Sequence, residues 1–482
     1  MIRGLIRGLS STRAASVRLA VLAATVAAAV SAGAATAAPP LPIVYDAPDP
    51  GGSEAAPARV PPPQRLFGFN EDIAGGAHGQ SPVTYSGLAR LAGATTIRTF
   101  IDWRRAEPQR DVWDEGWFNK WSYAYDSASR AGLRPILAIG MAPTWARDPE
   151  NQACDGPLTY CRFPPSRGMY DEWQEFVQEM VLRFPHAVLQ IWNEPNQNAN
   201  WGGAPHPERY AELLDVAYDT VKAINPAVPV LSAGIANNQE GNGAMPMRTF
   251  LERAFAAPRP MAQNMDALAL NMFPHSDQYG AGSLLAKSFK DVRETQAAAG
   301  DETPIFITET GLAGGTGFPQ SERQQATGLL RLYKRLTTMP DVIGVVFHRL
   351  IEPRDSNPNP VEQGYAWLRF DTAPLEPKPV YCAFAERAGN LYPPCLSVKI
   401  VAGPRGRVRS TRKRFQFVTT SPEAGFECSL DERPFRRCRT GRRYKRLAAG
   451  PHRFLVRARD RNGQTGNTVQ RKFRVARPGP RN

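Results

Sequence analysis

The chain has 482 residues, which is long enough for one large domain and a smaller one. Its 42% hydrophobic and 22% charged residues are typical of a folded globular protein and exclude a disordered or fibrous chain. The net charge of +14 is uneven: positions 401–482 hold 23 Lys and Arg against 5 Asp and Glu, a net of +18, which leaves −4 for positions 1–400.

The N-terminus is typical of a secretory signal peptide. Four arginines precede an apolar run from 19 to about 32, and Ala35-Thr36-Ala37 has the A-x-A form of a cleavage site. A retained membrane anchor is the alternative, but the run is Ala-rich and short for a bilayer span. We therefore predict a signal peptide over 1–37, a Pro/Gly-rich linker over 38–63 and a secreted protein without stable membrane insertion, with cell-wall association left open.

Export makes the six cysteines candidates for disulfides, because disulfides form in oxidising compartments. They fall into three close pairs: Cys154 with Cys161, Cys382 with Cys395, and Cys428 with Cys438. Six cysteines allow about 15 pairings, so this local pairing is an expectation from proximity alone. The six histidines show no HExxH or similar ligand spacing, and we expect no metal and no cofactor.

Short apolar runs alternate with helical patterns over positions 64–398. The runs cover 66–70, 96–102, 134–140, 188–193, 228–234, 265–271, 304–309 and 343–348. Positions 208–225 show the helical pattern, with Tyr210, Leu214 and Val221 on one face. The alternation predicts an α/β fold, a (β/α)8 TIM barrel with insertions. An open doubly wound sheet is the alternative, but no G-x-G-x-x-G follows the first run.

The pattern changes over positions 399–482. Apolar Phe454, Val456 and Ala458 alternate with Leu455, Arg457 and Arg459, and Asn462-Gly463 is a turn signal. This alternation predicts a small all-β sandwich with one local disulfide. The segment also carries the basic character of the chain.

Two glutamates end two of the predicted strands. Glu194 stands in Trp192-Asn193-Glu194-Pro195 after the fourth run, and Glu309 ends the seventh run. The carboxyl ends of the strands form the active-site face of such a barrel, so both carboxylates should meet there. A pair of carboxylates is what glycoside hydrolysis needs, one to protonate the leaving oxygen and one to meet the developing cation. Structural salt bridges are the alternative role for both glutamates.

The combination of these motifs over positions 65–385 resembles clan A glycoside hydrolases, the retaining (β/α)8 superfamily that includes families 5 and 39. The resemblance implies that Glu194 is the general acid/base and that Glu309 is the nucleophile. It also implies that Arg98 pairs with the nucleophile and that Asn193 binds the sugar 2-hydroxyl. An exposed strand arginine is the alternative for Arg98.

Further matches to the superfamily are looser. The stretch from Trp103 to Pro108 resembles its W-x-x-x-E-P segment, and Pro143-Thr144-Trp145 resembles the loop after its third strand. Aromatic rings pack on the apolar faces of sugars. We therefore take four tryptophans as candidates for substrate stacking, with core packing as the alternative for each: Trp103, Trp145, Trp192 and Trp201.

The sixth and eighth predicted strands depart from the superfamily pattern. Asn271-Met272-Phe273-Pro274 stands where His-x-Tyr-Pro is usual, so Phe273 lacks the hydroxyl that would reach the nucleophile. His275 is a candidate to compensate. His348 stands in the region where a tryptophan often lies under the sugar, which indicates a more polar floor. Asn271, Phe273, His275 and His348 complete the predicted substrate-binding set, and the departures leave the substrate class open.

The tail resembles an immunoglobulin- or fibronectin-like module of secreted bacterial proteins. The match runs from Phe426-Glu427-Cys428-Ser429-Leu430-Asp431 through Cys438 to Gly450-Pro451-His452. Its positive charge favours an anionic cell-wall polymer as partner. A solvated arginine-rich surface is the alternative, and nucleic acid is not expected as a partner of an exported enzyme.

These features predict a secreted retaining β-glycosidase that hydrolyses O-glycosidic bonds of oligo- or polysaccharides. Two alternatives remain: a sugar-binding or wall-associated barrel with weak or no catalysis, and a transglycosylase with the same residues. The sequence leaves the sugar, the linkage, endo or exo action and the oligomeric state open.

Overall fold

The computed structural model of the protein describes residues 65–74, 80–149, 162–237, 243–274, 283–353, 360–370 and 374–477, all within the compact unit Arg59–Asn482. The predicted signal peptide and linker, Cys154, Cys161 and His275 lie outside the described residues. Within those residues, no helix has the length and apolar character needed to cross a membrane.

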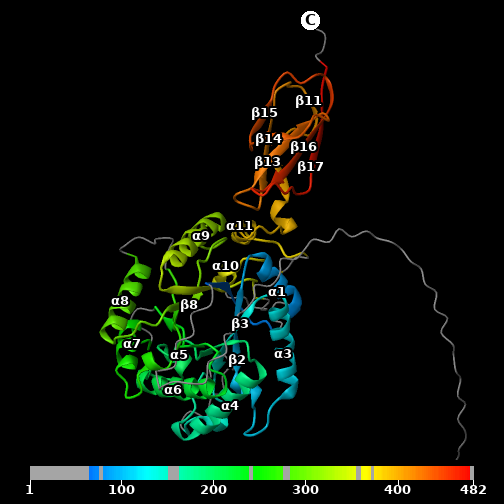
Figure 1. Cartoon of the computed structure of the whole chain (residues 1–482). Coiled ribbons are helices and arrows are strands. Elements are labelled where there is room, and N and C mark those ends of the chain that lie inside the picture. The colour runs from blue at the N-terminus through cyan, green and yellow to red at the C-terminus, as the bar shows by residue number, and fades with distance from the viewer. Residues whose placement is uncertain are drawn as a thin grey trace, which may run out of the picture. The chain divides into compact units, whose positions relative to one another are not determined.

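The larger part of the fold is a parallel β barrel surrounded by helices (Figure 1). Its strands are β1 (Leu66–Asn70), β2 (Thr96–Asp102), β3 (Arg134–Gly140), β4 (Val188–Ile191), β5 (Val230–Leu231), β6 (Ile235–Ala236), β7 (Leu268–Asn271), β8 (Ile305–Thr310) and β9 (Val342–Phe347). They are ordered β5-β4-β3-β2-β1-β9-β8-β7-β6. The predicted TIM barrel is therefore confirmed.

The fifth barrel strand is two short pieces rather than the single run predicted over 228–234. β5 pairs with β4, β6 pairs with β7, and Leu231 also bridges to Ala267 just before β7. The two pieces follow each other in the chain, so the sheet closes on itself at this point. The chain between them bends past Gly234, where a Cβ would lie 2.3 Å from Asn271 Oδ1. The close approach of Asn271 explains why glycine stands there.

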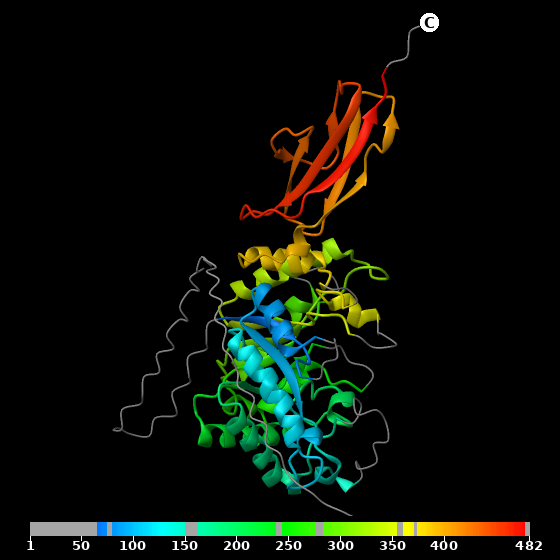
Figure 2. The same cartoon turned by 90° about the vertical axis from the view of Figure 1, so that its right-hand side faces the viewer.

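The helices cover the outside of the barrel (Figures 1 and 2). They are α1 (Pro82–Leu91), α2 (Trp103–Ala106), α3 (Glu115–Arg130), α4 (Tyr170–Arg183), α5 (Asn198–Trp201), α6 (Pro207–Ile224), α7 (Met247–Phe255), α8 (Leu284–Ala298), α9 (Glu322–Thr338), α10 (Pro360–Tyr365) and α11 (Pro379–Arg387). Short 3-10 turns occupy Thr144–Ala146, Arg167–Met169, Met261–Gln263 and Pro393–Leu396. Side-chain caps start several helices: Ser81, Asp114, Ser283 and Ser321 each accept from a backbone N–H of the first turn.

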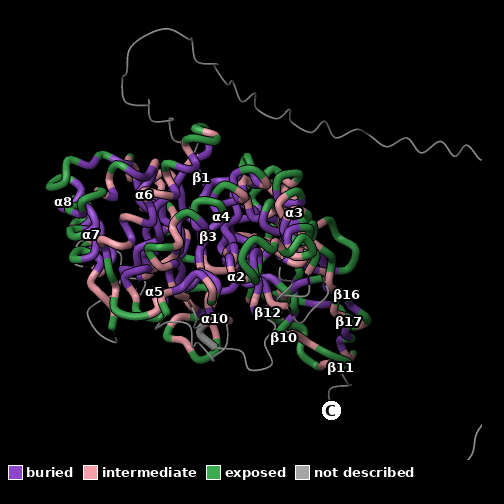
Figure 3. Tube along the Cα trace, turned by 90° about the horizontal axis from the view of Figure 1, so that it is seen from below, coloured by how far each residue is buried: buried purple, intermediate pink, exposed green. Residues whose placement is uncertain are grey.

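Two layers of apolar side chains hold the barrel. One fills its interior and includes Ile136, Phe306 and Val346. The other lies between the strands and the surrounding helices and includes Phe176 and Leu214. Figure 3 shows buried residues gathered around β1 and β3 and exposed residues along the outer helices α3 and α8. This arrangement is why the strands read as continuous apolar runs, since both of their faces are buried.

The C-terminal part consists of two β sheets. β10 (Val398–Ala402), β12 (Lys413–Thr419) and β15 (Arg442–Tyr444) form one. The other contains β11 (Gly406–Val408), β17 (Val469–Val475), β16 (Gly450–Arg459), β13 (Gly425–Leu430) and β14 (Arg436–Cys438). Their common core includes Phe415, Phe454 and Phe473. Cys428–Cys438 is a disulfide in this part, and Cys382–Cys395 is a second disulfide that starts in α11.

Gly344→Ala is expected to destabilise the barrel by about 1–3 kcal/mol, because overpacking a filled interior forces side chains out of place. A Cβ at position 344 would lie 2.3 Å from Phe306 Cζ. Urea unfolding would measure the change. Gly87→Ala is the matched control: it lies in exposed α1 with nothing within 4 Å of its Cβ, and should stabilise slightly. Equal stability of the two variants would contradict a tightly packed interior.

Candidate active site

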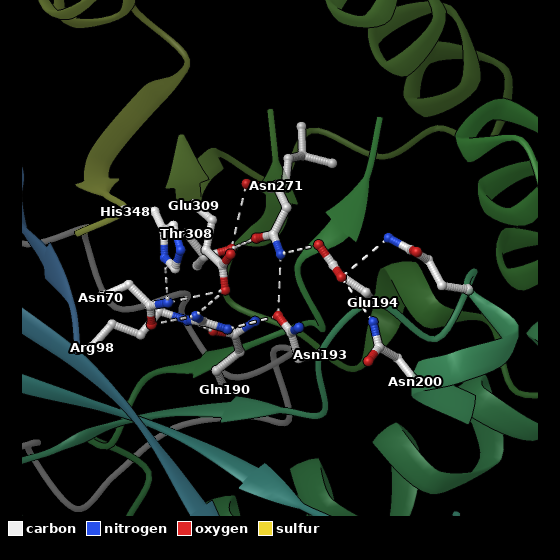
Figure 4. A network of polar contacts seen from close by, with 12 residues as sticks. Asn70, Arg98, Gln190, Asn193, Glu194, Asn200, Asn271, Thr308, Glu309 and His348 are labelled. Atoms are coloured by element: carbon white, nitrogen blue, oxygen red, sulfur yellow. Dashed lines mark hydrogen bonds and ion pairs between the residues drawn. The ribbon is translucent and has the colours of Figure 1, made fainter. Parts of the chain in front are cut away.

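Glu309 lies near the end of β8 and is held by a buried arginine (Figure 4). Arg98 Nη1 donates to Glu309 Oε1 over 2.6 Å, and Asn70 Nδ2 donates to the same oxygen over 3.3 Å. Arg98 on β2 is fully buried, so the ion pair forms away from solvent. The structure thus places Arg98 against Glu309 and not on the surface.

Arg98 is itself fixed by three further acceptors. Its Nε donates to Gln190 Oε1 over 2.6 Å, its Nη1 to Asn70 Oδ1 over 2.7 Å and its Nη2 to Asn193 Oδ1 over 2.8 Å. Its guanidinium also lies 4.7 Å from the centre of the Phe100 ring. A charged group buried in this way is stable only when its donors are satisfied, and here β1, β4 and β8 all supply acceptors.

Glu194 lies in the loop after β4 and is held by amides. Asn271 Nδ2 donates to its Oε1 over 2.9 Å, and Asn200 Nδ2 and Gln197 Nε2 donate to its Oε2 over 2.8 and 3.1 Å. The Glu194 backbone has a positive φ of 48°. Such a conformation is uncommon outside glycine and often marks functional positions.

Asn193 and Asn271 connect the two carboxylates (Figure 4). Asn193 Oδ1 accepts from Arg98 and, over 3.2 Å, from Asn271 Nδ2. Thr308 Oγ1 donates to Asn271 Oδ1 over 2.9 Å, which fixes the orientation of that amide. The Asn193 Nδ2 group has no acceptor among the described residues, so it is available to a ligand.

The two carboxylates have different electrostatic surroundings. Burial, followed by the negative charge of Glu309, raises the pKa of Glu194 to about 7. Amide donors surround Glu194, whereas a guanidinium contacts Glu309 directly. The arrangement therefore offers a carboxylic acid that holds a proton near neutral pH beside an ion-paired carboxylate.

Phe273 and His348 lie on the side of Glu309. The Phe273 ring makes edge contacts with His348 and Tyr365 at centroid distances of 6.2 and 5.5 Å. His348 Nε2 lies 2.7 Å from Glu362 Oε2, and its Nδ1 lies 3.4 Å from Asn70 Nδ2. His348 thus connects the site to α10, a helix that the sequence patterns did not single out.

The four tryptophans predicted to stack on sugars differ in how far they are buried and in what they contact. Trp103 is fully buried, its Nε1 donates to Glu107 Oε2 over 2.7 Å, and its ring stacks on Phe176. Trp201 is also buried, with edge contacts to Trp192 and Tyr210. The expectation of sugar stacking is therefore wrong for Trp103 and Trp201, since neither exposes a ring face.

Of the other two predicted tryptophans, Trp145 is the more exposed, and Trp192 is about as buried as Trp201. Trp145 is half-buried, and its Nε1 lies 3.3 Å from the Glu107 carbonyl oxygen. Trp192 is 3% exposed but lines a small cavity with Asn193 and Asn200. Its Nε1 donates to the Asn200 carbonyl oxygen over 2.8 Å, so Trp192 supports the loop that holds Glu194.

Sequence patterns missed the residues that support the glutamates: Asn70, Gln190, Gln197, Asn200, Glu362 and Tyr365. Asn70 ends β1 and Gln190 interrupts the apolar β4. A polar side chain within or at the end of a buried strand is a usable signal, because it must find partners. Asn200 and Tyr365 lie on short helices and carry no such signal. No group of three or more His, Cys, Asp or Glu that could hold a metal ion is found among the described residues.

Comparison with known proteins decides the family. The model of the cellulase family, glycosyl hydrolase family 5, matches residues 83–339, more than half of the chain. The chain belongs to glycosyl hydrolase family 5. The match confirms the resemblance to clan A, and the barrel extends beyond it on both sides through β1 and β9. No curated protein matches the chain.

Solved structures of glycoside hydrolases share the fold of this family 5 member. A family 39 glycoside hydrolase from the gut symbiont Bacteroides cellulosilyticus WH2 is 18% identical, with 82% of this chain and 80% of that chain covered and a TM-score of 0.50. GH5_18 from Streptomyces cattleya, in complex with GlcNAc, is 15% identical, with 72% and 85% covered and a TM-score of 0.51. At these identities the likeness concerns the fold alone.

The free energy of unfolding of Glu194→Gln, relative to that of the wild type, is expected to rise by about 1–3 kcal/mol as the pH is raised from 4 to 8. The folded-state pKa of Glu194 is raised, so the wild type loses stability as pH rises from the unfolded value to about 7. Glutamine does not ionise and avoids that loss. Denaturant unfolding at both pH values measures the difference, with Glu252→Gln on exposed α7 as control. A gap that does not change with pH would contradict the raised pKa.

Proposed function

We propose that this family 5 glycoside hydrolase is a retaining β-glycosidase, with Glu194 as acid/base and Glu309 as nucleophile. The observation that carries the proposal is the difference between the two carboxyl groups. Glu194 has a raised pKa of about 7, and Glu309 is ion-paired with Arg98. A retaining mechanism needs a proton donor and an ionised nucleophile at the same pH.

In the first step a Glu309 oxygen attacks the anomeric carbon of the bound sugar. The bond from that carbon to the glycosidic oxygen breaks, and the proton of Glu194 passes to the leaving oxygen. A covalent ester between Glu309 and the sugar remains. Arg98, which contacts the same carboxyl group, keeps it oriented throughout.

In the second step Glu194, now a carboxylate, takes a proton from an incoming water. The water oxygen attacks the anomeric carbon, the ester bond breaks, and Glu309 leaves as a carboxylate. Glu194 ends protonated, as it began. Asn193 Nδ2 has no acceptor among the described residues, which supports a role for this amide as donor to the sugar 2-hydroxyl.

Two other activities use the same residues. A transglycosylase would pass the sugar to another sugar and not to water. A sugar-binding barrel with weak catalysis is favoured by Phe273, which offers no hydroxyl to Glu309. The complete support of both glutamates favours the enzyme, because a binding protein needs neither the buried Arg98 ion pair nor the raised pKa of Glu194.

We also propose that the protein is exported. The signal-peptide pattern of positions 1–37 supports export. So do the disulfides Cys382–Cys395 and Cys428–Cys438, since such bonds persist in oxidising compartments.

The enzyme proposal can be tested by hydrolysis of four aryl β-glycosides: the glucoside, xyloside, mannoside and galactoside. Glu309→Ala is expected to lower kcat by about a thousandfold or more on any member that the wild type turns over. Glu252→Gln, a substitution on exposed α7, is the matched control and should keep the wild-type rate. NMR of the first product formed should show the β anomer. An initial α anomer would rule out the retaining mechanism, and no turnover of any aryl glycoside or polysaccharide would favour the binding protein.

We propose further that the β domain attaches the enzyme to an anionic cell-wall polymer. The outward face of its five-stranded sheet places cations opposite each other: Arg453 pairs with Lys472, and Arg407 pairs with Arg474. Like charges directly opposite in a sheet are destabilising. A face that keeps such pairs is suited to a polyanion, which would remove their repulsion.

The double variant Arg453→Gln/Lys472→Gln in the full chain is expected to bind anionic bacterial cell walls about tenfold more weakly at low salt. The reason is that two positive charges that attract the polymer are removed. Sedimentation with purified walls measures the binding. Lys287→Gln/Lys290→Gln on α8 is the control with the same charge change. Binding that stays equal on walls stripped of their anionic polymer would contradict the proposal.

A further inference from the structure

A cavity of about 400 Å3 lies at the carboxyl ends of β1, β2 and β3. Asp72 follows β1, Asp102 ends β2 and Met141 follows β3, and all of them line it. Phe100, Met141 and Arg162 also line the small cavity that contains Asn193 and Asn200. The larger cavity therefore adjoins the smaller one, whose Asn200 donates to Glu194, and its volume suits one or two sugar residues.

The lining of this cavity is cationic. Among the described residues it contains Arg104, Arg105, Lys120 and Arg162 against Asp72 and Asp102, a net of +2. Positions 1–400 carry a net charge of −4, so the cations are not part of a generally basic surface. Their concentration in one cavity needs a local explanation.

Of these cations, only Arg104 makes short contacts with Asp102. Arg104 donates to both of its carboxylate oxygens, over 2.8 and 2.7 Å. Arg105 Nε is 4.0 Å from Asp102, and its side chain is 59% exposed. Lys120 makes no ion pair with any described residue. Arg105 and Lys120 are therefore available to an anionic ligand.

Arg162 joins the cavity to the acid/base. One of its terminal nitrogens donates to Asn200 Oδ1, and Asn200 donates to Glu194 Oε2. Its Nε is buried and has no acceptor within the described part of the chain. Burial, despite nearby Glu194 and Glu309, lowers the pKa of Arg162. An anionic group in the cavity would pair with the positive charge of Arg162 and offset part of the cost of burying the guanidinium.

Three aromatic rings, those of Phe100, Trp117 and Trp121, also line the cavity. Trp117 and Trp121 on α3 lie 5.6 Å apart between ring centres, and Phe100 stands opposite the Arg98 guanidinium. Rings of this kind pack on the apolar faces of sugars. Cations beside aromatic rings suit a ligand that is both a carbohydrate and an anion.

We propose that this cavity is a subsite for a sugar residue that carries an anionic group, a carboxylate or a sulfate. The inference rests on the proposed glycosidase function and names its substrate class: an acidic oligo- or polysaccharide. Arg105, Lys120 and Arg162 bind the anionic group, and Trp117 and Trp121 contact the ring. Through Arg162 and Asn200, occupation of the subsite also holds Glu194 in place.

Binding to the full-length Glu309→Gln variant tests the subsite without hydrolysis. The probes are β-linked oligosaccharides that contain glucuronic acid, the same oligosaccharides after reduction of the carboxyl group, and sulfated forms of the reduced ones. By calorimetry, the acidic probe is expected to bind about tenfold or more tightly than the reduced probe at low salt, and high salt should narrow the gap. Tighter binding of the sulfated probe than of the acidic probe would identify sulfate as the preferred anion, and weaker binding would identify carboxylate.

The variant pair Arg105→Gln/Lys120→Gln is expected to lower the preference for the acidic probe by about fivefold or more, since two charge-assisted contacts are lost. Lys287→Gln/Lys290→Gln, with the same charge change on α8, should keep it. Equal affinity for both anionic probes and the reduced probe, or a preference that Arg105→Gln/Lys120→Gln leaves intact, would overturn the subsite.

The outcomes separate the two proposals. A preference for the acidic probe without hydrolysis of any substrate by the wild type would keep the subsite and reject the enzyme. Hydrolysis that is equally fast on acidic and reduced substrates, together with equal binding, would keep the enzyme and reject the subsite.

Discussion

The buried guanidinium of Arg98 is the interaction on which the rest of the site depends. It contacts Glu309, Asn70, Gln190 and Asn193, which come from β8, β1 and β4 and the loop that follows β4. Removing one acceptor would leave a buried charged donor unpaired, which is far more costly than losing one surface contact. The barrel must therefore close with these strands in one register for Arg98 to be tolerated.

The difference between the two glutamates follows from this arrangement. Arg98 supplies its positive charge directly to Glu309, whereas Glu194 receives neutral amide donors. The pKa of Glu194 is raised first by burial and then by the negative charge of Glu309. The two chemically identical side chains therefore stand in different electrostatic surroundings.

Positively charged side chains are distributed differently in the barrel and in the C-terminal β domain. In the barrel they are concentrated around a cavity at the carboxyl ends of β1, β2 and β3, within a segment whose net charge is negative. In the β domain they are spread over strands that pair cation with cation. A cavity can select a single anionic sugar, whereas a flat sheet face suits an extended polyanion. Both would serve an enzyme that acts on acidic polymers.

The sequence by itself predicted most of the barrel strands and singled out Glu194 and Glu309, because apolar runs and the Asn193-Glu194 pair are local patterns. The predicted bounds of β1, β2 and β3 agree with the structure residue by residue. Only the tertiary structure decided which tryptophans are buried and which polar residues reach Glu194. Trp103 and Trp145 were both candidates from sequence, yet Trp103 packs fully into the core and Trp145 is half-buried. Arg98 and Glu309 are 211 residues apart, and Arg162 meets Asn200 from another loop. Such contacts depend on how the barrel closes and how its loops pack, which no local pattern encodes.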